Sequence, residues 1–312
     1  MKYRKLGRSG LDVSAVGLGT NNFGRKLDFK ASETVILSAL DNEINTIDTS
    51  NSYGDGLSEE YIGKSLKGRR QEAVLATKVA SPQGEDPNNK GASRKHILEQ
   101  VEISLKRLQT DYIDLYQIHF PDPHTPIDET LLTLDDLVKS GKILYAGCSN
   151  FASWQLAQAM ERAKSLQISG FVSIQPHYSI LQREIESEIL PCCVEYGVGI
   201  LPYFPLENGL LTGKYKRNSI VPKGSRLSDG SPRSLKTLDN ANYDLLEKLE
   251  EFSENQGRSM VELAIAWLLS NKMISTVIAG ATKPEQIQLN AKGSDWNLSE
   301  EDIQYINEIL GD

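Results

Sequence analysis

Cysteine and histidine, the residues that build disulfide frameworks and zinc sites, are scarce in this 312-residue chain. Of its three cysteines, Cys192 and Cys193 are adjacent and Cys148 lies far away, a spacing that fits neither kind of site. His119 and His124 share the segment HFPDPH, but no neighbouring Cys or Glu completes a metal-binding set. We therefore expect reduced, structural cysteines and no metal centre.

Long hydrophobic runs are also missing. No segment approaches the roughly 20 apolar residues that a membrane-spanning helix needs. The first 19 residues contain no continuous apolar stretch of the kind found in secretory signals. These absences predict a cytoplasmic protein without a membrane partner.

Positive charge is in the minority, with 34 Lys and Arg against 42 Asp and Glu and a formal net charge of −8. This balance argues against a chain that covers the phosphates of nucleic acid, although it is compatible with a local basic pocket for one phosphorylated ligand. Nucleic acid is therefore not an expected partner.

The chain does contain a regular alternation of short apolar runs and helical segments. The apolar runs read as eight buried strands, at residues 14–20, 46–50, 73–79, 111–119, 143–150, 170–178, 197–204 and 275–282. Between them lie segments with helical periodicity, for which Ser32, Ser93 and Gly141 are candidate boundaries. Eight strand–helix units predict an α/β protein, a (β/α)8 TIM barrel forming a single domain over residues 1–312. An open doubly wound sheet is the alternative.

Three segments lie outside this alternation. Residues 1–13 are expected to form an N-terminal β-hairpin, and a helix beginning at Ser299 is an extra C-terminal element. Residues 205–236 are rich in Gly, Pro, Ser and Lys, and a loop of that length in a compact domain is usually functional.

Polar residues stand at the C-terminal ends of nearly all the expected strands, where barrels of this kind carry their chemistry. In chain order these residues are Thr20 with Asn21, Asp48, Lys78, His119, Ser149 with Asn150, Gln175, Tyr203, and Gly280 with Thr282. Taken singly, each could be a turn cap or a solvated side chain. A ring of this composition around one mouth is more than turns require.

Tyr53, in the segment TIDTSNSYGDG, is a candidate proton donor within this ring. A phenol with its ordinary pKa of about 10 is a poor acid near neutrality. An ammonium beside it would lower that pKa and a carboxylate would hold the ammonium in place, which are roles for Lys78 and Asp48. With His119 orienting a carbonyl oxygen, the four residues would protonate that oxygen while another group attacks its carbon.

None of these side chains is an obvious carbon nucleophile, since Lys78 is unavailable while it is protonated. A hydride from a reduced nicotinamide would fill that role. Asn150 and Gln175 suit a carboxamide, and Tyr203 offers an aromatic face for the nicotinamide ring.

Seven motifs resemble those of the aldo-keto reductases, in the same order and across essentially the whole chain. They are DTSNSYGDGLSEEYIGKSL, ATKV, LYQIHFPDP, GCSNF, IQPHYSILQRE, PYFPLENGLLTGKY and IAGATKPEQIQLN. The chain looks closest to the bacterial IolS-like branch and resembles the potassium-channel β subunits more distantly. The resemblance implies NADPH-dependent reduction of a small carbonyl compound, an aldehyde, ketone or keto sugar.

The resemblance also implies the residues that act. The catalytic tetrad would be Asp48, Tyr53, Lys78 and His119, with Tyr53 as general acid in reduction and general base in oxidation. The expected dinucleotide-binding residues are Gly19, Thr20, Asn21, Asp48, Ser149, Asn150, Gln175, Tyr203, Phe204, Pro205, Leu206, Gly209, Leu211, Gly213, Lys214, Arg226, Gly280, Thr282, Lys283, Gln286 and Asn290. Lys283 suits a 2′-phosphate, which favours NADPH over NADH. The substrate pocket is expected to involve Phe23, Tyr53, His119 and Phe120.

The chain departs from the family pattern at three of these places. Leu289 stands where many members have a glutamate near the adenine, and Gln286 stands where many have an arginine. Phe204 replaces a common serine. The preference for NADP is therefore less firmly supported than the tetrad.

Two other functions account for part of the pattern. A lyase could form a Schiff base on Lys78, but it would leave Asn150 and Gln175 without a role. A cofactor-binding regulatory or redox-sensing subunit is the second alternative, although it would not need a tuned proton donor. Two motifs fail outright, because GLGTNNFG has Asn22 in the third glycine position and GCSNF lacks the second glycine of a nucleophile elbow.

Overall fold

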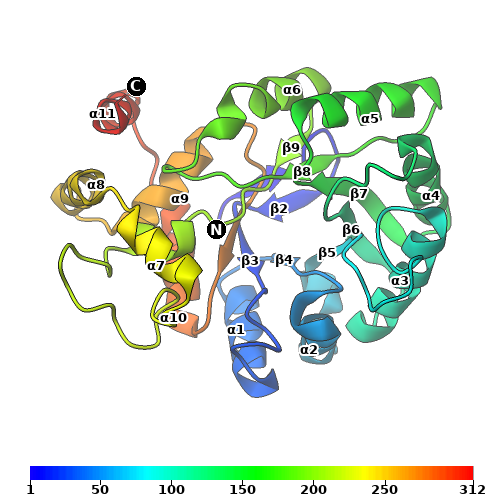
Figure 1. The fold of residues 1–312 in the computed structure, drawn as a ribbon, viewed down its shortest axis with the longest axis horizontal. Coiled ribbons are helices and arrows are strands. Elements are labelled where there is room, and N and C mark those ends of the chain that lie inside the picture. Colours follow the sequence, from blue (N-terminus) through cyan, green and yellow to red (C-terminus); the bar gives the residue numbers. More distant parts are fainter. Residues whose placement is uncertain (312) are drawn as a thin grey trace.

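The computed structural model describes residues 1–311, so that Asp312, the last residue of the expected domain, lies outside the described residues. An eight-stranded parallel sheet with the order β10-β3-β4-β5-β6-β7-β8-β9 lies among the helices (Figure 1). The strands are β1 (Tyr3–Lys5), β2 (Asp12–Ser14), β3 (Val16–Gly19), β4 (Thr46–Asp48), β5 (Val74–Val79), β6 (Ile113–Ile118), β7 (Ile143–Ser149), β8 (Ser173–Gln175), β9 (Gly199–Ile200) and β10 (Val277–Gly280). The α-helices are α1 (Phe29–Asp41), α2 (Leu57–Ser65), α3 (Arg94–Leu108), α4 (Ile127–Lys139), α5 (Ser153–Ser165), α6 (Ile189–Tyr196), α7 (Pro232–Asp239), α8 (Tyr243–Asn255), α9 (Met260–Ser270), α10 (Pro284–Gly293) and α11 (Glu300–Leu310). Short 3₁₀ turns are η1 (Tyr53–Gly56), η2 (Arg70–Glu72), η3 (Glu184–Glu186) and η4 (Glu207–Thr212).

Backbone hydrogen bonds between the two ends of this sheet close it into a barrel. The amide of Ile200 donates to the carbonyl of Met273 at 2.9 Å, and the amide of Ser275 donates back to Ile200 at 2.9 Å. The strands follow one another in sequence order around the sheet, without the reversal that marks a doubly wound fold. The predicted TIM barrel is therefore confirmed, and each of the eight predicted strands contains one observed strand.

The helices form where apolar residues recur on one face. In α1, Val35, Ile36, Ala39 and Leu40 make a buried stripe. The predicted start of this helix at Ser32 is wrong, because Ser32 lies on the buried stripe one turn inside the helix. The N-cap is Asp28, whose Oδ1 accepts a hydrogen bond from the amide of Ala31 at 2.9 Å. The predicted start of α3 is confirmed, since Ser93 caps it.

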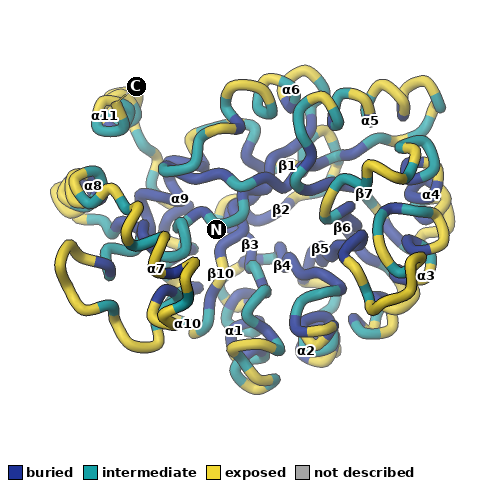
Figure 2. The backbone as a smooth tube through the Cα atoms, in the orientation of Figure 1, coloured by how far each residue is buried: buried dark blue, intermediate teal, exposed yellow. Residues whose placement is uncertain are grey.

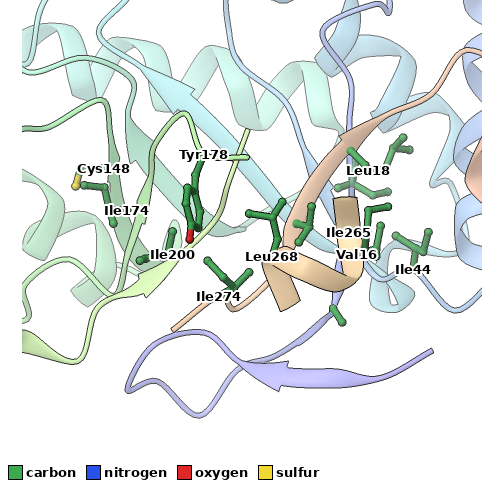
Figure 3. Packing of buried hydrophobic residues seen from close by; sticks show 14 of the residues in the cluster. Val16, Leu18, Ile44, Cys148, Ile174, Tyr178, Ile200, Ile265, Leu268 and Ile274 are labelled. Atoms are coloured by element: carbon green, nitrogen blue, oxygen red, sulfur yellow. The ribbon is translucent and has the colours of Figure 1, made fainter. Parts of the chain in front are cut away.

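The apolar core has two parts, separated by the strands. The larger part lies between the strands and the helices, and Figure 3 shows Ile265 and Leu268 of α9 among strand residues such as Val16 and Ile174. The smaller part lies inside the barrel and consists of Leu6, Val13, Val74, Ala76, Leu115, Leu201 and Ile278. Burial is accordingly highest along the strands, and the outer faces of the helices are exposed (Figure 2).

The N-terminal hairpin is confirmed as β1 and β2, and its segment supplies Leu6 and Val13 to the inner core. The predicted C-terminal helix is α11, which Ser299 caps together with Asp302. The expected long loop at residues 205–236 is only partly irregular, since η4 and the beginning of α7 fall within it. In the described residues 1–311, none of the helices combines the length and the apolar character needed to cross a membrane.

Candidate active site

The inward-facing positions of two neighbouring strands change from apolar to polar toward the C-terminal mouth of the barrel. Val74 and Ala76 of β5 belong to the inner core, and Lys78 is the next residue on the same face because alternate residues of a strand share a face. In β6, Leu115 of the inner core is followed in the same way by Gln117. The strand register sets Lys78 beside Gln117 at the mouth.

Asp48, the last residue of β4, accepts hydrogen bonds from side chains of three other strands. Its Oδ2 accepts from Lys78 Nζ at 2.5 Å, and its Oδ1 accepts from Gln117 Nε2 at 3.1 Å and Gln175 Nε2 at 2.8 Å. Lys78 Nζ also donates to the carbonyl of Thr49 at 2.9 Å. The Lys78 and Asp48 side chains are only 0% and 3% exposed, so each buried charge depends on the other for compensation.

The ammonium of Lys78 is held in its charged form. Burial by itself lowers the pKa of Lys78, but the interactions with Asp48 and then Tyr53 raise it by more, and the net shift is upward. A protonated amine has no lone pair with which to attack a carbonyl carbon. Lys78 is therefore placed to act as a fixed positive charge.

Tyr53 reaches this pair from a turn whose shape depends on two glycines. Gly54 has a φ of +57°, and a Cβ atom there would lie 2.7 Å from the carbonyl oxygen of Phe23. Gly56 has a φ of +94° and leaves room for the guanidinium of Arg107, which packs against it. Both positions require glycine. These glycines let the chain turn directly from Tyr53 into α2.

The phenol of Tyr53 keeps its proton at neutral pH. Its ring centroid lies 5.3 Å from Lys78 Nζ. Burial raises the pKa of Tyr53, Lys78 and more weakly Arg25 lower it, Asp48 raises it, and the net shift is upward from 10.0. The expectation of a lowered pKa is therefore wrong in its net direction. Lys78 acts as expected, but burial outweighs it.

His119, directly after β6, is neutral near physiological pH. Burial, followed by the charge of Lys78, lowers the pKa of its imidazole to about 3. Its Nδ1 lies 3.3 Å from Ser50 Oγ and 3.2 Å from Ser81 Oγ, and its ring stacks on Phe120 with centroids 4.5 Å apart. Its Nε2 has no hydrogen-bond partner in the described part of the chain, and it is free to meet a substrate oxygen.

The four residues predicted as a tetrad thus meet at one mouth. The rings of Tyr53 and His119 are 6.0 Å apart, centroid to centroid, at 77° to each other. In this arrangement the protonated phenol can donate its proton to an oxygen atom that the neutral imidazole also reaches. The fixed ammonium beside it can stabilise the negative charge left on the phenolate.

The residues expected at the nicotinamide carboxamide form one hydrogen-bonded chain. Tyr203 Oη donates to Asn150 Oδ1 at 2.9 Å, and Asn150 Nδ2 donates to the carbonyl of His119 at 2.9 Å and to Ser149 Oγ at 3.1 Å. Ser149 Oγ donates to the carbonyl of Gln175 at 2.7 Å. Gln175 Oε1 has no partner within residues 1–311 and is available to an amide N–H.

The loop after β9, residues 204–213, contains several residues in the left-handed region of backbone conformation. Among them are Phe204 with a φ of +53°, Gly209 with +98° and Gly213 with +71°. The guanidinium of Arg226 lies 4.8 Å from the ring centroid of Phe204. Arg226 makes no ion pair with any described carboxylate, and burial, followed by the nearby charge of Arg233, lowers its pKa. An uncompensated, half-buried guanidinium of this kind fits an anion such as a phosphate.

The residues expected at the adenosine end lie around the N-terminus of α10. Lys283 is the exposed N-cap residue, where backbone amides and the helix dipole also favour an anion. Gln286 Oε1 accepts from the amide of Thr282 at 2.7 Å and from its Oγ1 at 3.1 Å. Asn290 is 3% exposed, yet its amide has no partner among the described residues. The unpaired polar atoms of Asn290, together with those of Gln175 and Arg226, are suited to bind the polar groups of a dinucleotide.

Three of the residues predicted to contact substrate or dinucleotide, Phe23, Thr20 and Leu211, are fully buried in this structure, and their roles stay predictions. A turn in which the amide of Phe23 donates to the carbonyl of Thr20 folds the phenyl ring back into the core. Thr20 Oγ1 donates to the carbonyl of Asp48 at 2.9 Å and links two strands. Leu211 packs in the outer core from η4. Phe120 is 49% exposed and lies beside His119.

Three further residues of the site were not identified from the sequence: Gln117, which binds Asp48, and Ser50 and Ser81, which contact His119. Gln117 had a usable signal, since an amide two residues before His119 in the apolar run of β6 faces the same side. The serines lie in loops whose direction no sequence periodicity reveals.

Comparison with known proteins places these residues in a family. The sequence model of the aldo/keto reductase family matches residues 15–311. The chain is 37% identical over 317 residues to the aldo-keto reductase YhdN of Bacillus subtilis, covering 99% of this chain and 94% of the relative. It is 33% identical over 325 residues to an L-glyceraldehyde 3-phosphate reductase of Escherichia coli O157:H7, covering 100% of this chain and 93% of the relative.

A probable voltage-gated potassium channel subunit beta of Arabidopsis thaliana is equally similar, at 37% identity over 305 residues, which cover 95% of this chain and 92% of the relative. The expectation that channel β subunits are the more distant relatives is therefore not supported. A family model that spans the barrel, relatives that match nearly end to end and a tetrad assembled at the mouth lead to one conclusion. The chain belongs to the aldo/keto reductase family and is an oxidoreductase.

Proposed function

We propose that the protein reduces the carbonyl group of an aldehyde, ketone or keto sugar to an alcohol with NADPH. The observation that carries this proposal is the buried Lys78–Asp48 pair next to a protonated Tyr53 and a neutral His119. Motif similarity also supports a place in the IolS-like branch of the family.

In this proposal NADPH supplies the hydride that the carbonyl carbon receives. Tyr53 donates its phenolic proton to the carbonyl oxygen, and Lys78, 5.3 Å from the ring centroid, stabilises the phenolate that forms. Asp48 keeps Lys78 charged and in place. His119 directs its free nitrogen to the same oxygen and fixes its position, because a neutral imidazole can donate one hydrogen bond without competing for the proton.

NADPH is favoured over NADH by the cations that lack carboxylate partners. Lys283, at the N-terminus of α10, suits the 2′-phosphate, and Arg226 suits the pyrophosphate or the same phosphate. Neither residue makes an ion pair with a described carboxylate. Gln175 and Asn150 would hold the carboxamide, and Tyr203 would stack on the nicotinamide ring.

The direct test is the loss of NADPH absorbance when the protein meets a panel of aldehydes, ketones and keto sugars, with NADH in parallel. We expect turnover of at least one carbonyl class and a preference for NADPH. Tight NADPH binding without turnover of any carbonyl in the panel would contradict the enzymatic proposal.

A cofactor-binding regulatory role is the second candidate, and the similarity to a probable potassium channel subunit beta favours it. The Tyr53→Phe variant separates the two, because a reductase loses turnover and keeps its cofactor affinity, whereas a regulatory output would survive. The Schiff-base alternative is opposed by the protonated state of Lys78. Trapping of a substrate on Lys78 by borohydride would revive it.

A further inference from the structure

His177 and Glu207 form a contact outside the tetrad that the proposed reaction does not use. His177 follows β8, and Glu207 begins η4 in the loop after β9. His177 Nε2 and Glu207 Oε1 lie 2.6 Å apart, and Ser179 Oγ donates to the same Oε1 at 2.7 Å. The Glu207 side chain is only 13% exposed. One carboxylate therefore joins the loop after β9 to two residues of the loop after β8.

The imidazole of His177 also supports the aromatic residue expected beside the nicotinamide. It stacks on the ring of Tyr203, with centroids 5.3 Å apart and planes at 12°, and it meets the ring of Phe204 edge-on at 5.7 Å. The backbones of His177 and Tyr203 pair as well, in a parallel bridge that prolongs the barrel sheet. His177 thus covers one face of the Tyr203 ring and fixes the plane of that ring.

The backbone of residues 204–213 needs such support. Phe204, Glu207 and Asn208 have φ values of +53°, +42° and +55°, in the left-handed region that residues other than glycine avoid. Backbone of this kind persists only where surrounding contacts hold it, and it is common in segments that clamp ligands. The Glu207 carboxylate supplies such contacts at the strained position itself.

Further side-chain contacts connect the His177–Glu207 pair to the tetrad. From His177 the stack leads to Tyr203, whose hydroxyl donates to Asn150, and Asn150 donates to the carbonyl of His119. The loop after β9 is therefore linked through successive side chains to the residue that meets the substrate oxygen.

We propose that His177 and Glu207 are positioning residues, which hold residues 204–213 in the conformation that retains the dinucleotide and orient the ring of Tyr203 against the nicotinamide. This inference rests on the proposed function, because it concerns how the same cofactor site is held. The two residues have separable effects: the carboxylate–imidazole contact retains the cofactor, and the ring stack orients it.

The separation can be tested with variants that remove one contact at a time. Glu207→Ala removes the contact, while Glu207→Gln keeps an oxygen that can accept both hydrogen bonds. His177→Phe keeps an aromatic ring against Tyr203 but loses the bond to Glu207, and His177→Gln keeps a donor but loses the stack. Glu184→Ala, an exposed glutamate on η3 of the same connection, is the matched control.

Three measurements are made on each variant: the dissociation constant of NADP⁺ by fluorescence titration, the NADP⁺ release rate by stopped flow, and hydride transfer in a single turnover at saturating NADPH. For Glu207→Ala and His177→Phe we expect affinity to weaken and release to quicken about tenfold, the effect of one lost hydrogen bond to a charged group. Their single-turnover rates should stay within about twofold of wild type. Glu207→Gln should restore most of the affinity.

His177→Gln should give the opposite pattern, with affinity near that of wild type and a single-turnover rate lowered about tenfold, because misorientation of a reacting ring affects the chemical step. Unchanged affinity and release in both Glu207→Ala and His177→Phe would overturn the proposal. So would an equal loss in all variants including Glu184→Ala. If the wild-type protein bound no NADP⁺ or NADPH, the proposed function itself would fail, and that result is recognised before any variant is made.

Discussion

At the scale of single residues, the site depends on protonation states that burial fixes. Tyr53 keeps its proton because burial raises its pKa, Lys78 stays charged because of Asp48, and His119 is neutral because burial and Lys78 lower its pKa to about 3. Proton donor, fixed cation and neutral hydrogen-bonding ring are therefore in the required states together at neutral pH.

The role of the Tyr53 oxygen is tested by Tyr53→Phe. Loss of the donor should lower the reduction rate by roughly 10²- to 10⁴-fold, the usual contribution of general acid catalysis, and leave the dissociation constant of NADPH within about twofold. Steady-state kinetics and fluorescence titration measure the two quantities. Tyr61→Phe, on the outer helix α2, serves as the control. A Tyr53→Phe enzyme with near wild-type turnover would exclude this residue as the acid.

The depressed pKa of His119 should also appear in the stability of the protein. Folded His119 has a pKa of about 3 against 6.5 ordinarily, so between these values the unfolded chain binds a proton that the folded protein does not. Stability falls as the pH is lowered through this window. The His119→Asn variant lacks that proton-binding site. Its stability relative to wild type should therefore increase as the pH is lowered from 7 to 4. Urea denaturation across this range measures it, and parallel curves for both proteins would contradict the assignment.

At the scale of elements, the start of α1 was predicted at the wrong residue for a reason that can be measured. Asp28 caps the helix, whereas the Ser32 hydroxyl is buried without a partner. Asp28→Ala should cost about 1 kcal/mol of unfolding free energy. Ser32→Ala should cost nothing or stabilise by up to about 1 kcal/mol, because it removes an unpaired polar group. Urea denaturation of both variants decides the point, and the reverse ranking would restore Ser32 as the cap.

The sequence predicted where the strands and helices lie better than it predicted where individual side chains point. Buried parallel strands are short apolar runs, so all eight barrel strands could be located, and the four residues predicted as a tetrad lie together at the strand ends. The burial of Phe23 could not be predicted, because a turn closed by a hydrogen bond to the carbonyl of Thr20 directs the ring into the core. The burial of Leu211 could not be predicted either, because the packing of η4 depends on residues distant in the sequence.

Quantities that depend on burial were equally inaccessible to the sequence. The upward pKa shift of Tyr53 follows from how much protein surrounds the phenol, and the residue types alone indicated only the opposing effect of Lys78. Gln117 was overlooked although it occupies the position of β6 that pairs with Lys78 of β5. His177 and Glu207 are 30 residues apart, and only the folded barrel shows that they touch.

At the scale of the whole molecule, a net charge of −8 surrounds the proposed site for a dinucleotide, which is a polyanion. In the proposed site, Lys283 and Arg226 would attract NADPH against the overall negative field, and salt should weaken NADPH binding more steeply than NADH binding. Lys283→Gln should lower NADPH affinity about tenfold, leave NADH affinity nearly unchanged, and remove the difference in salt dependence. Titrations at several salt concentrations measure this. Equal losses for both dinucleotides would place Lys283 away from the 2′-phosphate.

The carboxylate of Asp48 has a further consequence for protein engineering. It is the only described carboxylate that pairs with Lys78, and it also accepts hydrogen bonds from two amide side chains. In an Asp48→Asn barrel, burial would act on Lys78 unopposed by that charge, lower its pKa and free its lone pair beside Tyr53. A single substitution, which replaces one carboxylate oxygen by an amide nitrogen, would thus turn the proposed proton-donating site into one that presents a neutral amine.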